Sequence, residues 1–198
     1  MEPRRVSGVV LAAGPSTRFD SELPKQLVEV GGEPLVVRAV HQTLESKLCE
    51  VIVVLGHCAA RIRATIAGLP LSIVENPAYC EGQSTSVRCG LAAVDPGSSA
   101  AMFIPVDQPK LTAPVVDALI DAYLRSDGWI VLPSFQGSRG SPVLIDRRLF
   151  PELELIAGDE GGRQIFARHE DRIVEVPLAS AEPLRDIDRL EDLNRYRS

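Results

Sequence analysis

The stretch from Val6 to Gly14, Val-Ser-Gly-Val-Val-Leu-Ala-Ala-Gly, decides the fold class of this chain. A continuous apolar run that is rich in valine and ends in glycine is typical of a strand buried on both faces. Outward along the chain, further short apolar runs indicate strands at residues 51–55, 71–74, 100–104, 129–132, 142–145 and 173–176. Helical patterns lie at residues 34–44, 59–67, 87–94, 112–125, 159–169 and 189–196.

This alternation predicts βαβ units and therefore an α/β fold of three layers, Rossmann-like, with a mainly parallel sheet. Ligands of such sheets bind beyond the carboxyl ends of the strands. The loops that follow residues 12, 74, 104 and 132 are therefore the places to look for a site.

Composition limits the class of protein. The chain has 198 residues, of which 45% are hydrophobic, and it shows no repeat or linker, which predicts a single domain over residues 1–198. Its net charge of −6 argues against a nucleic-acid or membrane-surface binder, because both need clustered Lys and Arg.

The cysteines and histidines favour no metal cluster. None of the four cysteines forms a CxxC pair and the three histidines are scattered, so a structural zinc site is not expected. The amino-terminal residues lack the apolar region of a signal peptide, and no apolar run approaches the roughly 20 residues that span a bilayer. We therefore expect a cytoplasmic protein.

The connection after the first strand carries the first candidate binding residues. It reads LAAGPSTRF from Leu11, with Pro-Lys-Gln-Leu starting at Pro24. A turn of small residues lets backbone N–H groups approach an anion, and Arg18 and Lys25 add charge for phosphate oxygens. The run is neither a P-loop nor a GxGxxG motif. From the residues alone, a phosphate cradle and an ordinary polar connection are about equally supported.

Three more segments place polar groups at the same end of the predicted sheet. The run from Asn76 to Gly90 brings hydroxyl side chains to a helix start, where they either cap the helix or hold a ligand. Asp107 follows a buried strand and suits either Mg²⁺ or a turn. Asp186 and Asp188, two residues apart on an extended segment, point the same way, and Asp188 would alternatively cap a helix.

These motifs, in this order, resemble those of the nucleotidyltransferases related to MobA and MocA. The matching segments are LAAGxSxRF with PKQL, the Asn76–Gly90 run, PxDxP around Asp107, a D-I-D segment at residues 186–188, and two acceptor-side segments, GxxGxPVL and GDxGxR. The sequence departs from the family pattern at Pro15, at Asp20 and at Arg189-Leu190. Pro15 lacks one N–H that a phosphate would use, which puts the loop geometry in doubt.

The resemblance implies a nucleotidyltransferase fold and a set of site residues. The implied catalytic residues are Lys25, Arg18 and Asp107. The implied nucleotide-binding residues are Leu11, Ala12, Ala13, Gly14, Ser16, Arg18, Lys25, Asn76, Gly82, Ser84 and Ser86. The implied Mg²⁺ ligands are Asp107 and Asp188, with Asp186 as the less secure choice, and the implied acceptor-binding residues are Arg139, Gly140, Asp159 and Arg163.

The resemblance also implies the reaction. A nucleoside triphosphate donates its nucleotide to a phosphorylated small-molecule acceptor and pyrophosphate leaves. Ala13 in LAAG, where guanylyltransferase relatives tend to have glycine, favours CTP. The acceptor is then molybdenum-loaded molybdopterin, with a molybdenum hydroxylase apoenzyme as a further partner. Two rivals stay open: a sugar-phosphate or other small-phosphate nucleotidylyltransferase of the same fold, and a non-catalytic nucleotide-binding accessory protein.

Overall fold

The structure is a computed structural model that describes residues 4–16, 19, 23–158 and 163–196. Its strands are β1 (Val6–Ala12), β2 (Glu29–Val30), β3 (Glu33–Pro34), β4 (Glu50–Leu55), β5 (Ser72–Glu75), β6 (Ala100–Pro105), β7 (Ile130–Phe135), β8 (Ser138–Arg139), β9 (Val143–Asp146) and β10 (Ile173–Pro177). Its helices are α1 (Leu35–Leu44), α2 (Ala59–Thr65), α3 (Gln83–Leu91), α4 (Ala113–Arg125), α5 (Phe150–Glu154) and α6 (Arg163–Arg168), with short 3-10 turns that include η1 (Lys25–Leu27) and η6 (Leu190–Tyr196).

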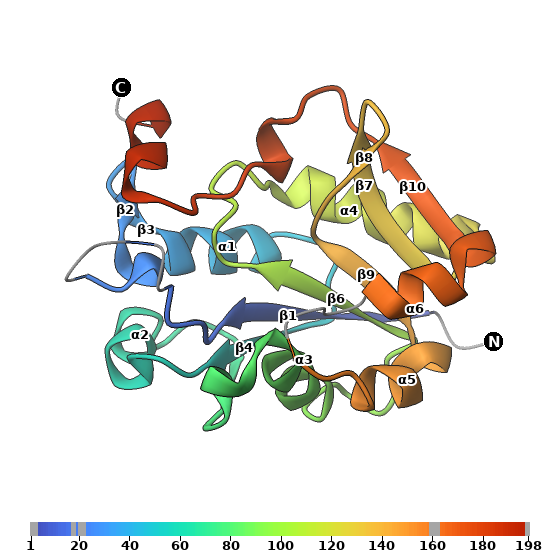
Figure 1. Ribbon diagram of the computed structural model, residues 1–198, viewed down its shortest axis with the longest axis horizontal. Coiled ribbons are helices and arrows are strands. Elements are labelled where there is room, and N and C mark those ends of the chain that lie inside the picture. Colours follow the sequence, from blue (N-terminus) through green and yellow to red (C-terminus); the bar gives the residue numbers. More distant parts are fainter. Residues whose placement is uncertain (1–3, 17–18, 20–22, 159–162, 197–198) are drawn as a thin grey trace.

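The strands form a mixed, mainly parallel sheet, as the sequence predicts. Its order is β10-β7-β9-β6-β1-β4-β5, and β8 pairs with β7. β1 lies between β4 and β6 and is parallel to both, while β9 is antiparallel to β6 and β7 (Figure 1). The central place of β1 explains why its sequence is apolar on both faces.

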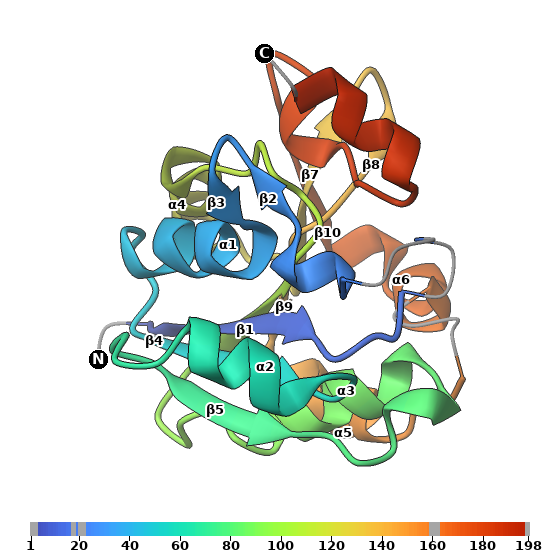
Figure 2. The same cartoon turned by 90° about the vertical axis from the view of Figure 1, so that its left-hand side faces the viewer.

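Helices cover both faces of the sheet and make three layers (Figure 2). Val10 and Met102 point to one face, where they share a core with α1, α2 and α4. Val9 and Phe103 point to the other face and share a core with α3, α5 and α6. No helix in the described part of the chain is both long and apolar enough to cross a membrane.

Most predicted elements are present with bounds shifted by one to three residues, the short strands β2, β3 and β8 were not predicted, and the larger differences concern helices. α3 begins at Gln83 rather than at residue 87, because its first turn is polar and lacks apolar periodicity. The predicted last helix is the 3-10 turn η6, and the predicted helix at 159–169 is described only from Arg163. The sequence did not reveal the five-residue α5, which is too short to show a period.

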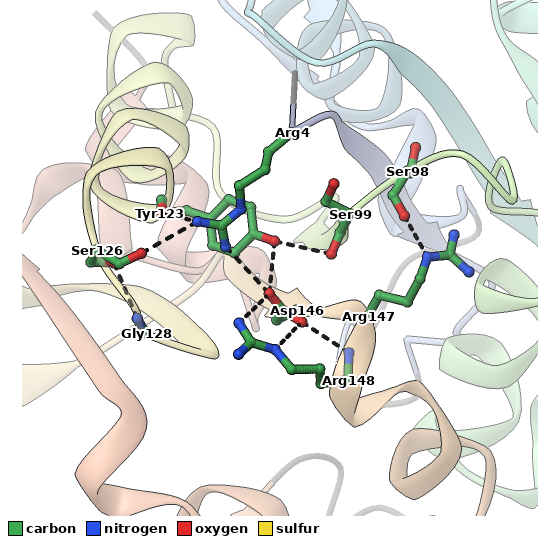
Figure 3. A network of polar contacts seen from close by, with 9 residues as sticks. All are labelled: Arg4, Ser98, Ser99, Tyr123, Ser126, Gly128, Asp146, Arg147 and Arg148. Carbon is green, nitrogen blue, oxygen red and sulfur yellow. Dashed lines mark hydrogen bonds and ion pairs between the residues drawn. The ribbon is translucent and has the colours of Figure 1, made fainter. Parts of the chain in front are cut away.

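A buried polar network lies at the amino ends of the parallel strands (Figure 3). Asp146 pairs in register with Ala100, the first residue of β6, and is only 5% exposed. Its carboxylate accepts hydrogen bonds from the Tyr123 hydroxyl at 2.8 Å and from the backbone and guanidinium of Arg148 at 2.9 Å. Because ligands bind at the other end of such sheets, this network ties β9 to α4 rather than forming a site.

Candidate active site

A cavity of about 590 Å³ opens at the carboxyl ends of β1 and β6. Leu11 and Pro105, which pair in register near the ends of these strands, both line it. The remaining lining residues come from four separate segments of the chain: Ala13, Gly14, Pro15, Ser16, Lys25, Gln26, Tyr79, Cys80, Gly82, Gln83, Ser86, Val106, Asp107 and Asp188. The fold therefore brings the loop after β1, the loop before α3, the loop after β6 and the carboxyl-terminal segment to one place.

A lysine bridges two carboxylates in this cavity. The ammonium of Lys25 lies 2.7 Å from an oxygen of Asp107 and 3.6 Å from an oxygen of Asp188. Lys25 is only 6% exposed although it carries a charge, and such burial requires a partner. The turn η1 and the loop after β6, far apart in sequence, therefore meet through this ion pair.

The carboxyl-terminal segment is held against the loop after β6. The backbone N–H of Ile187 donates to the carbonyl of Asp107 at 2.9 Å, and Gln108 donates its side-chain amide to Asp186 at 3.0 Å. Burial of the carboxyl and the nearby charge of Asp107 raise the pKa of Asp186 to about 6. Asp188 faces Lys25, whereas Asp186 faces Gln108.

Asn76 organises the other wall without lining the cavity. It is buried, and its side-chain amide donates to the hydroxyls of Thr85 at 2.8 Å and Ser86 at 3.0 Å. The single hydroxyl hydrogen of Thr85 is in turn shared between the carbonyls of Ala78 at 3.0 Å and Gly82 at 2.8 Å. Asn76 thereby holds Ser86, which lines the cavity.

Other predicted site residues do not line the cavity. Ala12 belongs to the core on the α1 side, and Ser84 is buried, with its backbone N–H donating to the carbonyl of Gly158 at 3.1 Å. Arg139 lies on β8, where it forms ion pairs with Glu170 and with Glu175, and it does not line the cavity.

The adjacent Gly140 packs near Leu184 and is also outside the cavity lining. Arg18 and Asp159 lie outside the described residues, and Arg163 is described only as the first residue of α6.

Comparison with known proteins settles the family. A family model described as the MobA-like NTP transferase domain matches residues 8–173. The chain belongs to this family. This MobA-like chain is 30% identical to the nicotine blue oxidoreductase of Paenarthrobacter nicotinovorans, over 96% of its own length and 95% of that protein.

Solved structures of similar proteins give the same fold. The crystal structure of Rv0371c from Mycobacterium tuberculosis H37Rv superposes with a TM-score of 0.84 at 27% identity, and the match covers 98% of this chain and 97% of the other. A manganese complex of Rv0371C superposes with a TM-score of 0.80, also at 27% identity, over 97% of each chain. Molybdopterin-guanine dinucleotide biosynthesis protein A from Archaeoglobus fulgidus, at 15% identity and a TM-score of 0.72 over 96% of each chain, shares the fold.

The carboxylates of this MobA-like protein fit a divalent cation. Asp107 and Asp188 both approach the Lys25 ammonium, so their oxygens lie within reach of one cation. The described residues contain no group of three or more His, Cys, Asp or Glu side chains able to hold a metal. Two carboxylates alone suit Mg²⁺, which usually takes one or two from the protein and completes its shell with water and substrate phosphates.

Sequence reasoning missed several residues of the cavity. Tyr79, Cys80 and Gln83 line it beside the predicted Gly82, and Gln26 lines it beside Lys25. The PKQL motif contained Gln26, but a neutral side chain gave no electrostatic reason to select it. Proximity to a motif residue was the available signal, since each of these four is within three positions of one.

Proposed function

We propose that this nucleotidyltransferase-family protein transfers CMP from CTP to molybdenum-loaded molybdopterin and releases pyrophosphate. An acceptor phosphate oxygen forms the new bond to the α-phosphorus, and the bond from that phosphorus to the β-phosphate oxygen breaks. Such a reaction needs positioning and charge neutralisation more than covalent catalysis. The observation that carries the proposal is the meeting of Lys25, Asp107 and Asp188 in a cavity lined by the LAAG loop.

Each group has a separate role in this proposal. A Mg²⁺ ion held by Asp107 and Asp188 neutralises charge on the phosphates. Lys25 and Arg18 stabilise the departing pyrophosphate, and Gly82 and Ser86 bind the nucleotide from the opposite wall. Lys25 neutralises the two carboxylates in this geometry, and its ammonium would be available to phosphate oxygens if Asp107 and Asp188 held a cation instead.

Two observations support the finer parts of the proposal. Ala13 lines the cavity at the loop position where guanylyltransferase relatives tend to have glycine. A relative of known structure was solved with manganese, which is consistent with a divalent cation at these carboxylates. Arg139 and Arg163 are kept as acceptor-binding residues in the proposal, although Arg139 must release Glu170 or Glu175 to take part.

Pyrophosphate release tests the proposal. The chain is incubated with each of CTP, GTP, ATP and UTP, with Mg²⁺ or Mn²⁺, and with molybdenum-loaded molybdopterin. We expect release with CTP, and a loss of at least about 100-fold in Asp107→Asn, the scale on which removal of one charge-stabilising group acts. Asp171→Asn is the matched control, since that side chain is 75% exposed and pairs with Arg172. Equal turnover in wild type and Asp107→Asn would contradict the assignment.

A second function has one specific observation in its favour. The relative of 30% identity that spans nearly the whole chain is named as an oxidoreductase. Oxidation of NADH and NADPH by an added electron-accepting dye, followed by absorbance, separates the two functions. Enzyme-dependent oxidation of the cofactor, without pyrophosphate release with any phosphorylated acceptor, would favour the redox function. Release with a sugar phosphate instead of molybdopterin would keep the reaction and change the acceptor, while nucleotide binding without any turnover would indicate an accessory protein.

A further inference from the structure

Gln26 is a buried side chain whose two amide hydrogens are both committed to the loop after β1. It lies on η1 directly after Lys25 and is only 2% exposed. Its amide nitrogen donates to the carbonyl of Ala12 at 3.1 Å and to that of Gly14 at 2.8 Å. One amide group therefore clamps the turn on both sides of Ala13.

The carbonyl between these two is held from another direction. The backbone N–H of His57 donates to the carbonyl of Ala13 at 3.0 Å. All three successive carbonyl oxygens of the turn are thus engaged by protein donors. A carbonyl oxygen that faced the cavity would repel a phosphate, whereas a backbone N–H attracts one. Because protein donors hold these carbonyl oxygens, the turn presents its backbone N–H groups to the cavity. Pro15 contributes no N–H group.

The amide of Gln26 has one possible orientation in these surroundings. A flipped amide would place its oxygen against the carbonyl oxygens of Ala12 and Gly14, two acceptors facing a third. With the nitrogen there, the side-chain oxygen is buried and has no hydrogen-bond partner among the described residues. Gln26 also lines the cavity, and its amide orientation is fixed from the side of the loop by the Ala12 and Gly14 carbonyls.

We propose that Gln26 is a positioning residue for the polyphosphate: its amide holds the Ala12 and Gly14 carbonyls and thereby shapes the Ala12–Gly14 turn into an anion-binding surface. The inference rests on the proposed function, because that function supplies the triphosphate. The inference adds a neutral residue, which contacts the loop after β1 through its carbonyl oxygens, to the charged residues of the proposed phosphate site. η1 then serves two purposes, since Lys25 provides charge and Gln26 provides loop geometry.

Gln26→Met tests this inference, because methionine has a similar length and no hydrogen-bonding amide. Affinity is measured by calorimetry for inorganic tripolyphosphate with Mg²⁺, and by NMR titration for cytidine, which carries no phosphate. We expect tripolyphosphate affinity to fall about tenfold or more, which corresponds to about 1.4 kcal/mol, while cytidine affinity changes less than about twofold. Gln164→Met, an exposed position on α6, is the matched control and should leave both unchanged.

The outcomes separate this inference from the proposed function. Unchanged tripolyphosphate affinity in Gln26→Met, an equal loss for cytidine and tripolyphosphate, or a wild-type chain that binds no tripolyphosphate would each overturn the role of Gln26. A selective loss of tripolyphosphate binding supports that role even where wild type releases no pyrophosphate with any acceptor, a result that contradicts the proposed function alone. Thermal unfolding is recorded for every variant. Where Gln26→Met does not fold, Gln26→Asn, which keeps a neutral amide but is one methylene too short to reach both carbonyls, gives the same comparison.

Discussion

Replacing Asp146 by asparagine should destabilise the fold without altering the chemistry of the cavity. In the network of Figure 3, one carboxylate oxygen accepts from the Arg148 backbone and guanidinium, each at 2.9 Å. The other accepts from Arg148 at 2.9 Å, from Tyr123 at 2.8 Å and from Arg4 at 3.3 Å. Asparagine replaces one of these oxygens with an NH₂ group that faces hydrogen-bond donors.

The magnitude follows from the contacts and from the exposure of the partners. Hydrogen bonds to charged groups contribute about 1.5–3 kcal/mol each, and buried donors left without an acceptor add to the loss. The guanidinium of Arg148 is about half exposed, so water replaces part of what it loses. We expect a net loss of about 2–3 kcal/mol, or a Tm lower by roughly 5–10 °C for a domain of this size.

The pH dependence gives the prediction a sign. Burial opposes ionisation of Asp146, but the hydrogen bonds from Arg148 and Tyr123 outweigh it and lower the pKa of this carboxyl. Its stabilisation is therefore complete above about pH 4, the ordinary aspartate range, and is lost as the pH falls below that. Urea unfolding at pH 7 and at pH 3 should show the difference between wild type and Asp146→Asn shrinking in acid.

Asp121→Asn is the matched control for this measurement. Its carboxylate also pairs with a cation, Lys47, at 2.8 Å, but on the surface, where such pairs contribute little, so its Tm should barely change. Unchanged stability of Asp146→Asn, or a loss as large in Asp121→Asn, would refute the reasoning. So would a large drop in turnover per folded Asp146→Asn molecule, because the network lies at the opposite end of the sheet from the cavity.

Two further changes probe the cavity itself. Lys25→Ala removes the ammonium group between Asp107 and Asp188, so Mn²⁺ should bind more tightly while triphosphate affinity falls at least several-fold. Calorimetry measures both affinities, with Lys47→Ala as the control. Weaker Mn²⁺ binding in Lys25→Ala would contradict the proposed arrangement of the site. Gly56→Ala places a Cβ 2.7 Å from the Ala13 carbonyl oxygen and 2.8 Å from the Tyr79 side chain, so the loops that carry Ala13 and Tyr79 must move apart. Nucleotide affinity should fall at least about tenfold, with little change in the control Gly97→Ala. Retained affinity in Gly56→Ala would contradict this expectation.

The central sheet was predictable because its sequence signal is strong and local. β1 coincides with the predicted residues 6–12, and β4 and β6 differ from prediction by one residue at one end. Asp107 could be placed at the ligand end because it follows a buried strand directly. Of Lys25, Asp107 and Asp188, only Asp107 directly follows a strand, so it was the family resemblance that placed the three in one predicted site.

The remaining details depend on contacts that sequence patterns do not encode. Gln26 acts through two backbone carbonyls, and nothing in its neighbours' identities signals that contact. The sequence pattern likewise did not reveal that Asn76, a predicted nucleotide-binding residue, donates to Thr85 and Ser86. The partners of Arg139 come from η4 (Glu170–Arg172) and β10, more than 30 residues away, so its ion pairs could not be foreseen.

A crystal structure with Mn²⁺ and a non-hydrolysable CTP analogue would locate cation and triphosphate together, since the anomalous signal of manganese marks the cation independently of the protein. We expect an anomalous peak within coordinating distance of Asp107 and Asp188, the triphosphate against the Ala12–Gly14 turn, and the ammonium of Lys25 on phosphate oxygens. A triphosphate bound outside this cavity, or manganese bound away from both carboxylates, would contradict the proposed site.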